Sequence, residues 1–565
     1  MDDEILIKTF PNGYILRDDG LFKLIKKAKD FEEIKISNRI EVLAAARDDK
    51  SQNWSKVVRF KDPDGKVKTL ILPDFLFISD SRELEEKLSS NGLYICSPKE
   101  LKKHLNDYET DKRALCIDKV GWYEESFVFP DSSVIGYNEE EIIFHNDNIL
   151  DEYQTKGRLE DWREHISKYC QGNSRLVLAV STAFAGALLY ITGQESGGLH
   201  FVGHSSTGKS TILKVACSVW GGKDFLKTWR ATDNGLEGIA TTRNDTLLVL
   251  DELGELGDTG KAGEIAYMLG NGNGKIRSNK NGEAKKSFSW RLLYLSSGEK
   301  DLSDCAIESK KKLKAGQEIR LLNIPAQPDV NSFGVFETLH DKKTGKILSD
   351  YLSSIVKEYH GTAARAFIKC LVDDGFNKIA NDFKAFLGNA ERKYLPNDAD
   401  SQVKRAFNRF MLSAFAGEYA TQKGITGWNE EESLNASVKC FQAWIKNRGG
   451  VKDQEIKALL GEVRYFFEQH QESRFYDLGL SDIENGKVNN MVGYKELSNG
   501  EFLYYVLPQS FKVICTGYNL EFAKKTLFSA GWINNTSPKQ LGKGPLRGKR
   551  VYVFTPKIWT DEDVD

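Results

Sequence analysis

The sequence predicts an α/β protein whose largest part is built on a parallel β-sheet, and two observations support this. Three apolar runs of four or five residues, at 198–202, 246–250 and 292–295, end in polar or charged side chains. Buried parallel strands are continuously apolar because helices cover both faces of their sheet. In addition, a glycine-rich loop at 203–208 separates the first run from a helical pattern.

This loop has the pattern of a phosphate-binding loop, G-x-x-x-x-G-K-[ST]. Its two glycines let the backbone N–H groups turn toward phosphate oxygens, and the next helix adds its positive N-terminal end. Lys209 would supply a mobile positive charge, and Ser210 a hydroxyl ligand for Mg²⁺. We expect ATP as the ligand and Mg²⁺ as its cofactor. The predicted nucleotide-binding residues are Gly203, His204, Ser205, Ser206, Thr207, Gly208, Lys209, Ser210 and Thr211.

Two carboxylates, Asp251 and Glu252, follow the second apolar run. Ligands collect at the carboxyl ends of strands in open α/β sheets, so both acids should lie near the loop. Asp251 would hold Mg²⁺ through water opposite Ser210, and Glu252 would polarise the attacking water. The chain before Asp251 also has room for an extra strand at 225–229, which is typical of the additional-strand class of P-loop ATPases and not of small-molecule kinases.

Further polar side chains are predicted at the ends of the remaining core strands. Ser296 and Ser297 follow the third apolar run, and either could sense the γ-phosphate. Arg320 directly precedes the apolar run 321–325, where it could reach the nucleotide of a neighbouring subunit; such arginines raise rates by roughly 10³–10⁵. The lysine run at 310–314 is interpreted as a solvated helix face. The predicted catalytic residues are Lys209, Glu252, Ser297 and Arg320.

Two basic segments are candidates for DNA contacts. Between 275 and 291 there are six basic residues and one acidic residue, around an Asn281-Gly282 turn signal. A basic hairpin just before the third core strand could grip a nucleic-acid backbone. Residues 522–560 contain eight basic residues and no acid, and their helix followed by two strands fits a winged helix. The predicted DNA contacts are Lys275, Arg277, Lys280, Lys285, Lys286, Lys543, Arg547, Lys549 and Arg550.

Length and composition predict several domains. A chain of 565 residues exceeds one core. We expect an α+β N-terminal domain at 1–150, an ATPase core at 151–345, a helical lid or linker at 346–470 and a winged-helix-like DNA-binding domain at 471–565. The N-terminal domain could be a DNA collar, an oligomer scaffold or a partner-docking domain, and the sequence does not choose between them.

Composition also bears on location. The formal net charge is −2, and the eight cysteines include no C-x-x-C pair, which argues against a zinc site and a disulfide framework. The acidic N-terminus is unlike a secretory signal, so a cytoplasmic location is expected. The uncharged stretch 176–194 approaches the length of a membrane span, but its small and polar residues favour a helix buried in the ATPase core.

Five segments together resemble the domain-of-unknown-function ATPases of bacterial mobile elements, which include the replication proteins of staphylococcal cassette chromosomes and pathogenicity islands. These segments are 203–211, 229–237, 250–253, 296–299 and 316–320, and the resemblance covers roughly 115 to 370. That family is similar to the AAA+ minichromosome-maintenance helicases. The resemblance implies a hexameric ring, Arg320 acting in trans, Lys280 and its neighbours as a pore hairpin, and Arg365 as a weak candidate for a second nucleotide sensor.

The sequence therefore predicts an ATP-dependent DNA helicase and replication initiator of a mobile genetic element. Its expected partners are single-stranded or forked DNA, further copies of the chain and possible replication proteins, with no membrane. The alternative is an ATP-gated origin-binding or regulatory protein without processive unwinding. The pore-type hairpin favours the motor, and the basic C-terminal unit favours the switch.

Overall fold

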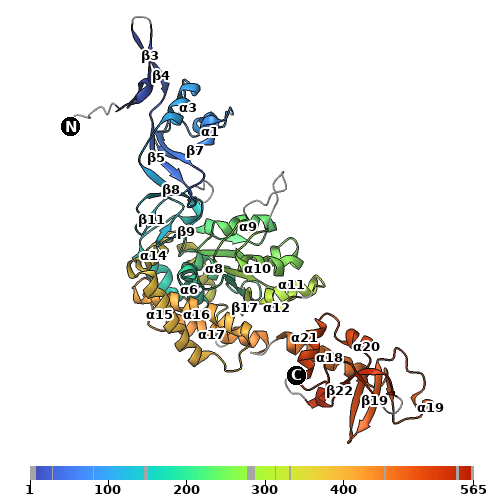
Figure 1. Cartoon of the computed structure of the whole chain (residues 1–565). Coiled ribbons are helices and arrows are strands. Elements are labelled where there is room, and N and C mark those ends of the chain that lie inside the picture. The colour runs from blue at the N-terminus through green and yellow to red at the C-terminus, as the bar shows by residue number, and fades with distance from the viewer. Residues whose placement is uncertain are drawn as a thin grey trace. The chain divides into compact units, whose positions relative to one another are not determined.

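The computed structural model describes residues 8–27, 30–80, 82–144, 150–275, 287–311, 313–329, 332–450, 454–541 and 546–560 (Figure 1). Contacts group the chain into two compact units. Unit 1 comprises Met1–Tyr394 and Phe407–Trp444, and unit 2 comprises Leu395–Ala406 and Ile445–Asp565. The finer four-part division of the sequence stays a prediction.

Unit 1 begins with two β-sheets and three short helices. β6 and β7 form a hairpin and pair antiparallel from Ser55↔Pro73 to Lys61↔Val67. Together with the helices α1 to α3 this gives the α+β character predicted for this part of the chain. A four-stranded sheet has the order β1-β2-β3-β4, and a five-stranded sheet has the order β12-β8-β5-β6-β7. The elements are β1 (Lys8–Thr9), β2 (Tyr14–Arg17), β3 (Gly20–Lys26), β4 (Phe31–Ser37), β5 (Ile40–Arg47), β6 (Ser55–Lys61), β7 (Val67–Pro73), α1 (Phe75–Ile78), α2 (Glu83–Ser90), α3 (Pro98–Asp107), β8 (Arg113–Ile117) and β12 (Glu141–Phe144).

The central sheet of unit 1 is parallel and has the strand order β14-β15-β16-β13-β17. Its strands are β13 (Gly197–Val202), β14 (Lys227–Thr228), β15 (Leu247–Asp251), β16 (Leu293–Gly298) and β17 (Leu321–Pro325). The extra strand predicted at 225–229 is present but only two residues long, because residues 223–225 form a helical turn. The fold is therefore a mixed α/β structure with a parallel sheet, as the apolar runs predicted.

Helices surround this sheet. They include α4 (Leu159–Trp162), α5 (Lys168–Cys170), α6 (Ser174–Ala185), α7 (Leu188–Thr192), α8 (Lys209–Cys217), α9 (Asp233–Thr241), α10 (Ala262–Asn271), α11 (Leu302–Glu308) and α12 (Ala315–Glu318). The prediction of a helix at 310–314 is wrong: Lys310 and Lys311 follow α11 in a turn, and Lys310 has a φ of 52°. The Lys311 ammonium donates to the Gly260 carbonyl at 3.0 Å, so this side chain caps a neighbouring loop.

The uncharged stretch 176–194 forms α6, α7 and the turn between them. Every residue of α6 is buried, and Trp220 donates its ring N–H to the Ala183 carbonyl at 2.7 Å. The prediction of a helix inside the core is thus confirmed. Across the described residues, no helix combines the length and apolar character that crossing a bilayer requires.

The helical pattern after the sheet is confirmed in five helices, and Figure 1 labels the last four of them in yellow to orange. They are α13 (Gly345–Ile355), α14 (Thr362–Asp374), α15 (Phe376–Tyr394), α16 (Ser401–Gln422) and α17 (Glu432–Arg448). Helix α13 packs on α8, which follows the phosphate loop. The hydroxyls of Thr211 and Ser349 lie 2.5 Å apart in this contact, so a helix of this region directly supports the loop.

The remainder of unit 2 has its own core around Phe467, Tyr504, Trp532 and Phe554. Its sheet has the order β18-β19-β20-β22-β21, and the strands predicted at 502–507 and 549–554 and the helix at 520–530 are confirmed. The elements are α18 (Gln454–His470), β18 (Phe475–Asp477), α19 (Asp482–Asn485), β19 (Gly493–Ser498), β20 (Glu501–Val506), α20 (Pro508–Ile514), α21 (Leu520–Ser529), β21 (Lys539–Gln540), β22 (Arg550–Phe554) and α22 (Lys557–Thr560).

A small sheet joins the N-terminal sheets to the central sheet through Asp245. This sheet consists of β9 (Gly121–Tyr123), β10 (Ser126–Val128) and β11 (Val134–Ile135). The buried Asp245 carboxylate accepts from the Trp122 backbone N–H at 3.0 Å and from the Arg291 Nε at 2.5 Å. One carboxylate thus ties three segments that are distant in the sequence.

Replacing Asp245→Ala should destabilise the protein by about 2 kcal/mol, because Trp122 loses its acceptor and Arg291 its counter-charge. The Arg291 side chain is 34% exposed and can turn toward water, so we expect a smaller loss of stability than for a fully buried ion pair. The urea midpoint of the full chain measures this. Exposed Asp350→Ala on α13 is the control and should change stability by less than about 0.5 kcal/mol. Equal urea midpoints for Asp245→Ala and Asp350→Ala would contradict the stabilising role of Asp245.

Candidate functional site

The predicted phosphate loop lies between the end of β13 and the start of α8. Two of its residues have a left-handed backbone, Ser206 with a φ of 60° and Gly208 with a φ of 104°. An L-residue reaches φ near 104° only with strain, so glycine is required at 208. Residues 204–206 are exposed, and the helix axis of α8 begins at Lys209. The loop therefore presents its backbone to solvent at a helix N-terminus, where anions bind.

The Lys209 ammonium is folded onto the loop. It donates to the carbonyls of Gly203 and His204 at 2.8 and 2.7 Å, and the residue is only 7% exposed. A carbonyl oxygen carries only a partial charge, so a phosphate oxygen at the same place is the stronger partner for this cation. Lys209 is therefore positioned to give up its hydrogen bonds to the loop carbonyls and to bond a phosphate oxygen instead.

Ser297 connects the predicted acids. Its hydroxyl donates to an Oδ1 of Asp251, and it accepts from the Glu252 backbone N–H at 3.3 Å. Glu252 itself has a φ of 55°, a left-handed conformation that is uncommon for a non-glycine residue. Strained backbone of this kind clusters at functional sites. The three residues therefore form one constellation at the carboxyl edge of the sheet.

Ser296 points to the opposite face of the sheet. Its hydroxyl lies 2.8 Å from the ring N–H of Trp229 and 2.8 Å from Nδ1 of His200. Burial lowers the pKa of His200 to about 4, so its ring is neutral at pH 7. Because Nε2 faces the Lys300 carbonyl at 3.0 Å and must donate, Nδ1 accepts the Ser296 proton. Ser296 is thus engaged within the core, and the geometry favours Ser297 as the residue that senses the γ-phosphate.

Arg320 lies at the other edge of the sheet from the loop of its own chain. Leu321 pairs with Gly198, and Pro325 pairs with Val202, so Arg320 is at the amino end of β17. The length of β17 separates it from the loop by roughly 17 Å, which exceeds the reach of its side chain. Its guanidinium pairs with Glu195 at 3.1 Å and lies 5.9 Å from the ring centre of Tyr267. Arg320 cannot serve the nucleotide site of its own chain.

The predicted basic hairpin is described only at its root. The antiparallel bridge Asn273↔Ser289 and the bond from the Gly274 N–H to the Phe288 carbonyl at 2.9 Å form that root. Lys275 pairs with Asp233 at 3.1 Å. The other predicted contacts in this segment, Arg277, Lys280, Lys285 and Lys286, lie outside the described residues, as does Lys543.

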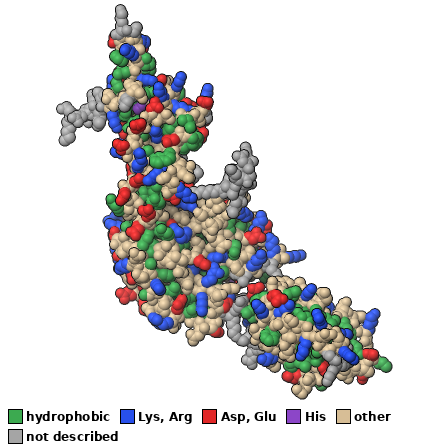
Figure 2. Space-filling view, in the orientation of Figure 1, with side chains coloured by type: hydrophobic (Ala, Val, Ile, Leu, Met, Phe, Trp, Pro, Cys, Tyr) green, Lys and Arg blue, Asp and Glu red, His purple; other side chains and the backbone are tan. Residues whose placement is uncertain are grey.

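The remaining predicted DNA contacts, Arg547, Lys549 and Arg550, are exposed on unit 2. The ammonium of Lys549 lies 4.3 Å from the ring centre of Tyr494. On the face shown in Figure 2, Lys and Arg side chains of this unit are scattered among hydrophobic and neutral atoms. These residues have the exposure that a DNA contact needs, and their role stays a prediction.

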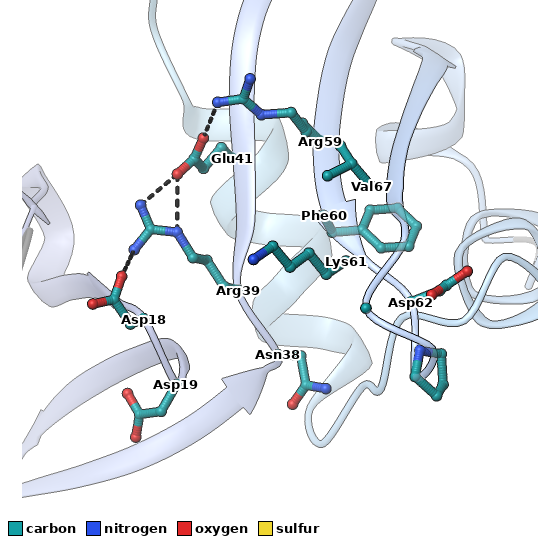
Figure 3. A pocket seen from close by; sticks show the side chains of 12 residues that line it. Asp18, Asp19, Asn38, Arg39, Glu41, Arg59, Phe60, Lys61, Asp62 and Val67 are labelled. Carbon is teal, nitrogen blue, oxygen red and sulfur yellow. Dashed lines mark hydrogen bonds and ion pairs between the residues drawn. The ribbon is translucent and has the colours of Figure 1, made fainter.

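A cavity of about 710 Å³ lies away from these residues, among the N-terminal strands (Figure 3). Arg39 donates to Asp18 and Glu41 at 2.8 and 2.9 Å, and Arg59 donates to Glu41 at 2.9 Å. Burial raises the pKa of Glu41, but the hydrogen bonds from Arg59 and Arg39 outweigh this and hold the pKa below its usual value. The arginines are thus matched by carboxylates of the cavity, which argues against a phosphate site there.

Several neighbours of the site could not be predicted from the sequence. Glu195, which pairs with Arg320, and the backbone of residues 333–338, which crosses the loop, have no motif that marks them. Arg365, the weak candidate for a second sensor, donates to Asp131 and Ser133 at 2.7 and 2.6 Å. This pairing holds Arg365 against the N-terminal part of the chain, and its sensor role stays a prediction.

Residues 14–289 match the family model described as "Domain of unknown function (DUF927)". The matched stretch is just under half of the chain, 276 of 565 residues, and is similar to that family. The family resemblance predicted from the sequence is thereby confirmed. The match begins closer to the N-terminus than the resemblance did, and it ends before Ser297 and Arg320.

The structure of "SCCmec type IV Cch - active helicase" is similar to this chain, with a TM-score of 0.74 and 16% sequence identity, over 97% of this chain and 98% of that one. At this identity the likeness shows a common fold. "The apo structure of NrS-1 C terminal region (305-718)" matches with a TM-score of 0.33 and 9% identity, over 91% of this chain and 95% of that one. This TM-score is too low to show a common fold. No curated protein matches the sequence.

Lys209→Ala should weaken the binding of fluorescently labelled ADP at least about 10-fold, because a charged donor to phosphate is lost. Arg320→Ala should leave this affinity within about twofold, because Arg320 lies at the opposite sheet edge and ADP lacks a γ-phosphate. Fluorescence titration of the dilute full chain measures both. A comparable loss of ADP affinity in the Arg320→Ala protein would contradict the placement of Arg320 at the opposite edge of the sheet.

Proposed function

We propose that the chain is an ATP-dependent DNA helicase and replication initiator of a bacterial mobile genetic element. The observation that carries this proposal is the constellation of the phosphate loop with Asp251, Glu252 and Ser297 at one edge of a parallel sheet. The strand order β14-β15-β16-β13-β17 supports an AAA+ core, because the loop strand lies between the Ser297 strand and the strand after Arg320. Further support comes from the similar structure, whose title names an active helicase.

In this proposal the chain's own residues divide the work of ATP hydrolysis. The loop backbone and Lys209 bind the phosphates, and Glu252 orients and deprotonates the attacking water. Ser297 holds Asp251 and the backbone of Glu252 in fixed relation through two hydrogen bonds. In this proposal the residue that activates water and the residue that binds the metal are thus both held by the Ser297 hydroxyl.

Ser210 and Asp251 fit Mg²⁺, because both offer oxygen ligands next to the loop and this ion keeps several waters. When bound, the ion would neutralise charge on the phosphates. Among the described residues there is no cluster of three or more His, Cys, Asp or Glu that could hold a metal by itself.

Arg320 is proposed to act on the nucleotide of the next subunit in a hexameric ring. The distance between Arg320 and the phosphate loop of its own chain supports this role, because Arg320 borders no nucleotide site within that chain. The pair with Glu195, which is 60% exposed, would open when the neighbouring subunit docks. Ring formation would then complete each site.

The trans role can be tested by mixing. Arg320→Ala and Lys209→Ala proteins should each have little ATP turnover alone, and their mixture should recover part of it, since mixed rings contain sites with both residues intact. A phosphate-release assay across mixing ratios measures the recovery. No recovery at any ratio, in mixtures that light scattering shows to be assembled, would rule out a shared site.

DNA would be moved by the basic hairpin at 275–291, whose root adjoins the sensor strand β16. Five residues, 292–296, lie between the end of the hairpin and Ser297, so movement of Ser297 with nucleotide state would reach the hairpin through this short stretch of chain. The helix pair α20–α21 followed by β21 and β22 supports a winged helix in unit 2. That same unit favours the second candidate, an ATP-gated origin-binding protein that marks or melts DNA without unwinding it.

A strand-displacement assay with forked DNA and ATP separates the two candidates. Wild-type protein should displace the strand, and Glu252→Gln should not, because hydrolysis loses its base. Lys280→Ala with Lys285→Ala should lose unwinding and keep basal ATP turnover, because these residues contact DNA and not nucleotide. ATP turnover and DNA binding without displacement in the wild-type protein would favour the gated binder, and full unwinding by the double variant would exclude the pore hairpin.

A further inference from the structure

The segment Phe333–Thr338, here called the strap, crosses the phosphate loop in direct backbone contact. The Val335 N–H donates to the Thr207 carbonyl at 3.0 Å. Gly334 has a φ of +72°, and a Cβ added there would lie 2.5 Å from the same carbonyl oxygen. Two backbones approach this closely only where one of them lacks a side chain.

The strap also packs against the residue that gives the loop its shape. A Cβ at Gly208 would lie 2.9 Å from the Val335 Cγ2. Val335 is fully buried and Phe336 is 1% exposed, so the strap presents an apolar support to the loop and not a solvated edge. The left-handed turn at Gly208 therefore rests on the Val335 side chain.

The far end of the strap is anchored independently of the loop. Buried Asn173 accepts from the Glu337 and Thr338 N–H groups at 2.7 and 3.0 Å. The Glu337 carboxylate accepts from the Ser174 N–H and pairs with Lys439 on α17. Because α6 begins at Ser174 and is buried throughout, this anchor belongs to the rigid core.

We propose that the strap is a positioning element of the nucleotide site: anchored by Asn173 and Glu337, it holds the backbone of Thr207 and Gly208 in the shape that receives phosphate. This inference rests on nucleotide binding at the loop. Gly334 and Val335 act through the loop backbone, so they are positioning residues. Their contribution is to keep the loop N–H groups oriented before the ligand arrives, which reduces the cost of binding.

Gly334→Ala tests the proposal against a matched control, Gly424→Ala. Both glycines have a φ of +72°, so both variants carry the same backbone strain, but nothing lies within 4 Å of a Cβ at 424. At 334 the strap and the loop must separate by about 0.9 Å to restore an ordinary contact of 3.4 Å from 2.5 Å. Displacement on this scale can cost up to about 100-fold in function.

We expect the Kd of the full-length Gly334→Ala protein for labelled ADP to rise at least about 10-fold, with a matching rise in the KM for ATP, while Gly424→Ala binds as wild type. The shared backbone strain should lower the thermal stability of both variants, and Gly334→Ala should lose more because of its clash with the Thr207 carbonyl, so the affinities are compared at a temperature at which both proteins are folded. Val335→Ala, which removes the support under Gly208 without adding atoms, should weaken binding in the same direction and is the second variant if Gly334→Ala does not fold.

The outcomes distinguish the strap from the proposed function. Wild-type protein that binds no nucleotide would overturn the proposed function itself. Wild-type binding together with equal affinities for Gly334→Ala and Gly424→Ala would overturn the strap. Where Gly334→Ala does not fold, unchanged affinity in Val335→Ala would do so.

Discussion

The parallel register of β13, β15 and β16 is the constraint on which the site depends. Phe201 pairs with Ser297, and Leu250 pairs with Ser296, so these three strands end at one edge of the sheet. The loop, the acids and Ser297 are separated by tens of residues in the chain, yet the register brings them together. A slip of one residue in β16 would exchange the faces of Ser296 and Ser297, so Ser297 would no longer face Asp251.

Much of this arrangement could be predicted from contiguous patterns. The loop, the apolar strands and the acids at the end of β15 each occupy fewer than ten consecutive residues. Their conformation follows directly from these local sequence patterns. The choice between Ser296 and Ser297 could not be made, because it depends on which face of β16 meets Asp251. The helix predicted for the lysine run after α11 is wrong. A run of charged residues is typical of a solvated helix face, but here the backbone turns at Lys310.

Contacts between distant segments were beyond prediction for a different reason. The strap, the Glu195 partner of Arg320 and the Asp245 junction each join residues of ordinary type, with no spacing that marks them. Asp245 in particular lies just before β15 and belongs to no motif. Its energetic weight comes from being fully buried between Trp122 and Arg291, and burial of a charge is a property of the folded chain.

The folded position of Lys209 links these observations. Its two bonds require the carbonyls of Gly203 and His204 to point inward, in a loop that turns back at the left-handed residues Ser206 and Gly208. The strap bonds the carbonyl of Thr207, which lies between these two residues, and so keeps that group turned away from the ammonium. Lys209 is then left with the carbonyls of Gly203 and His204, and both can be exchanged for phosphate oxygens. The loop is thus organised before any ligand binds, and its order depends on residues more than a hundred positions away in the chain.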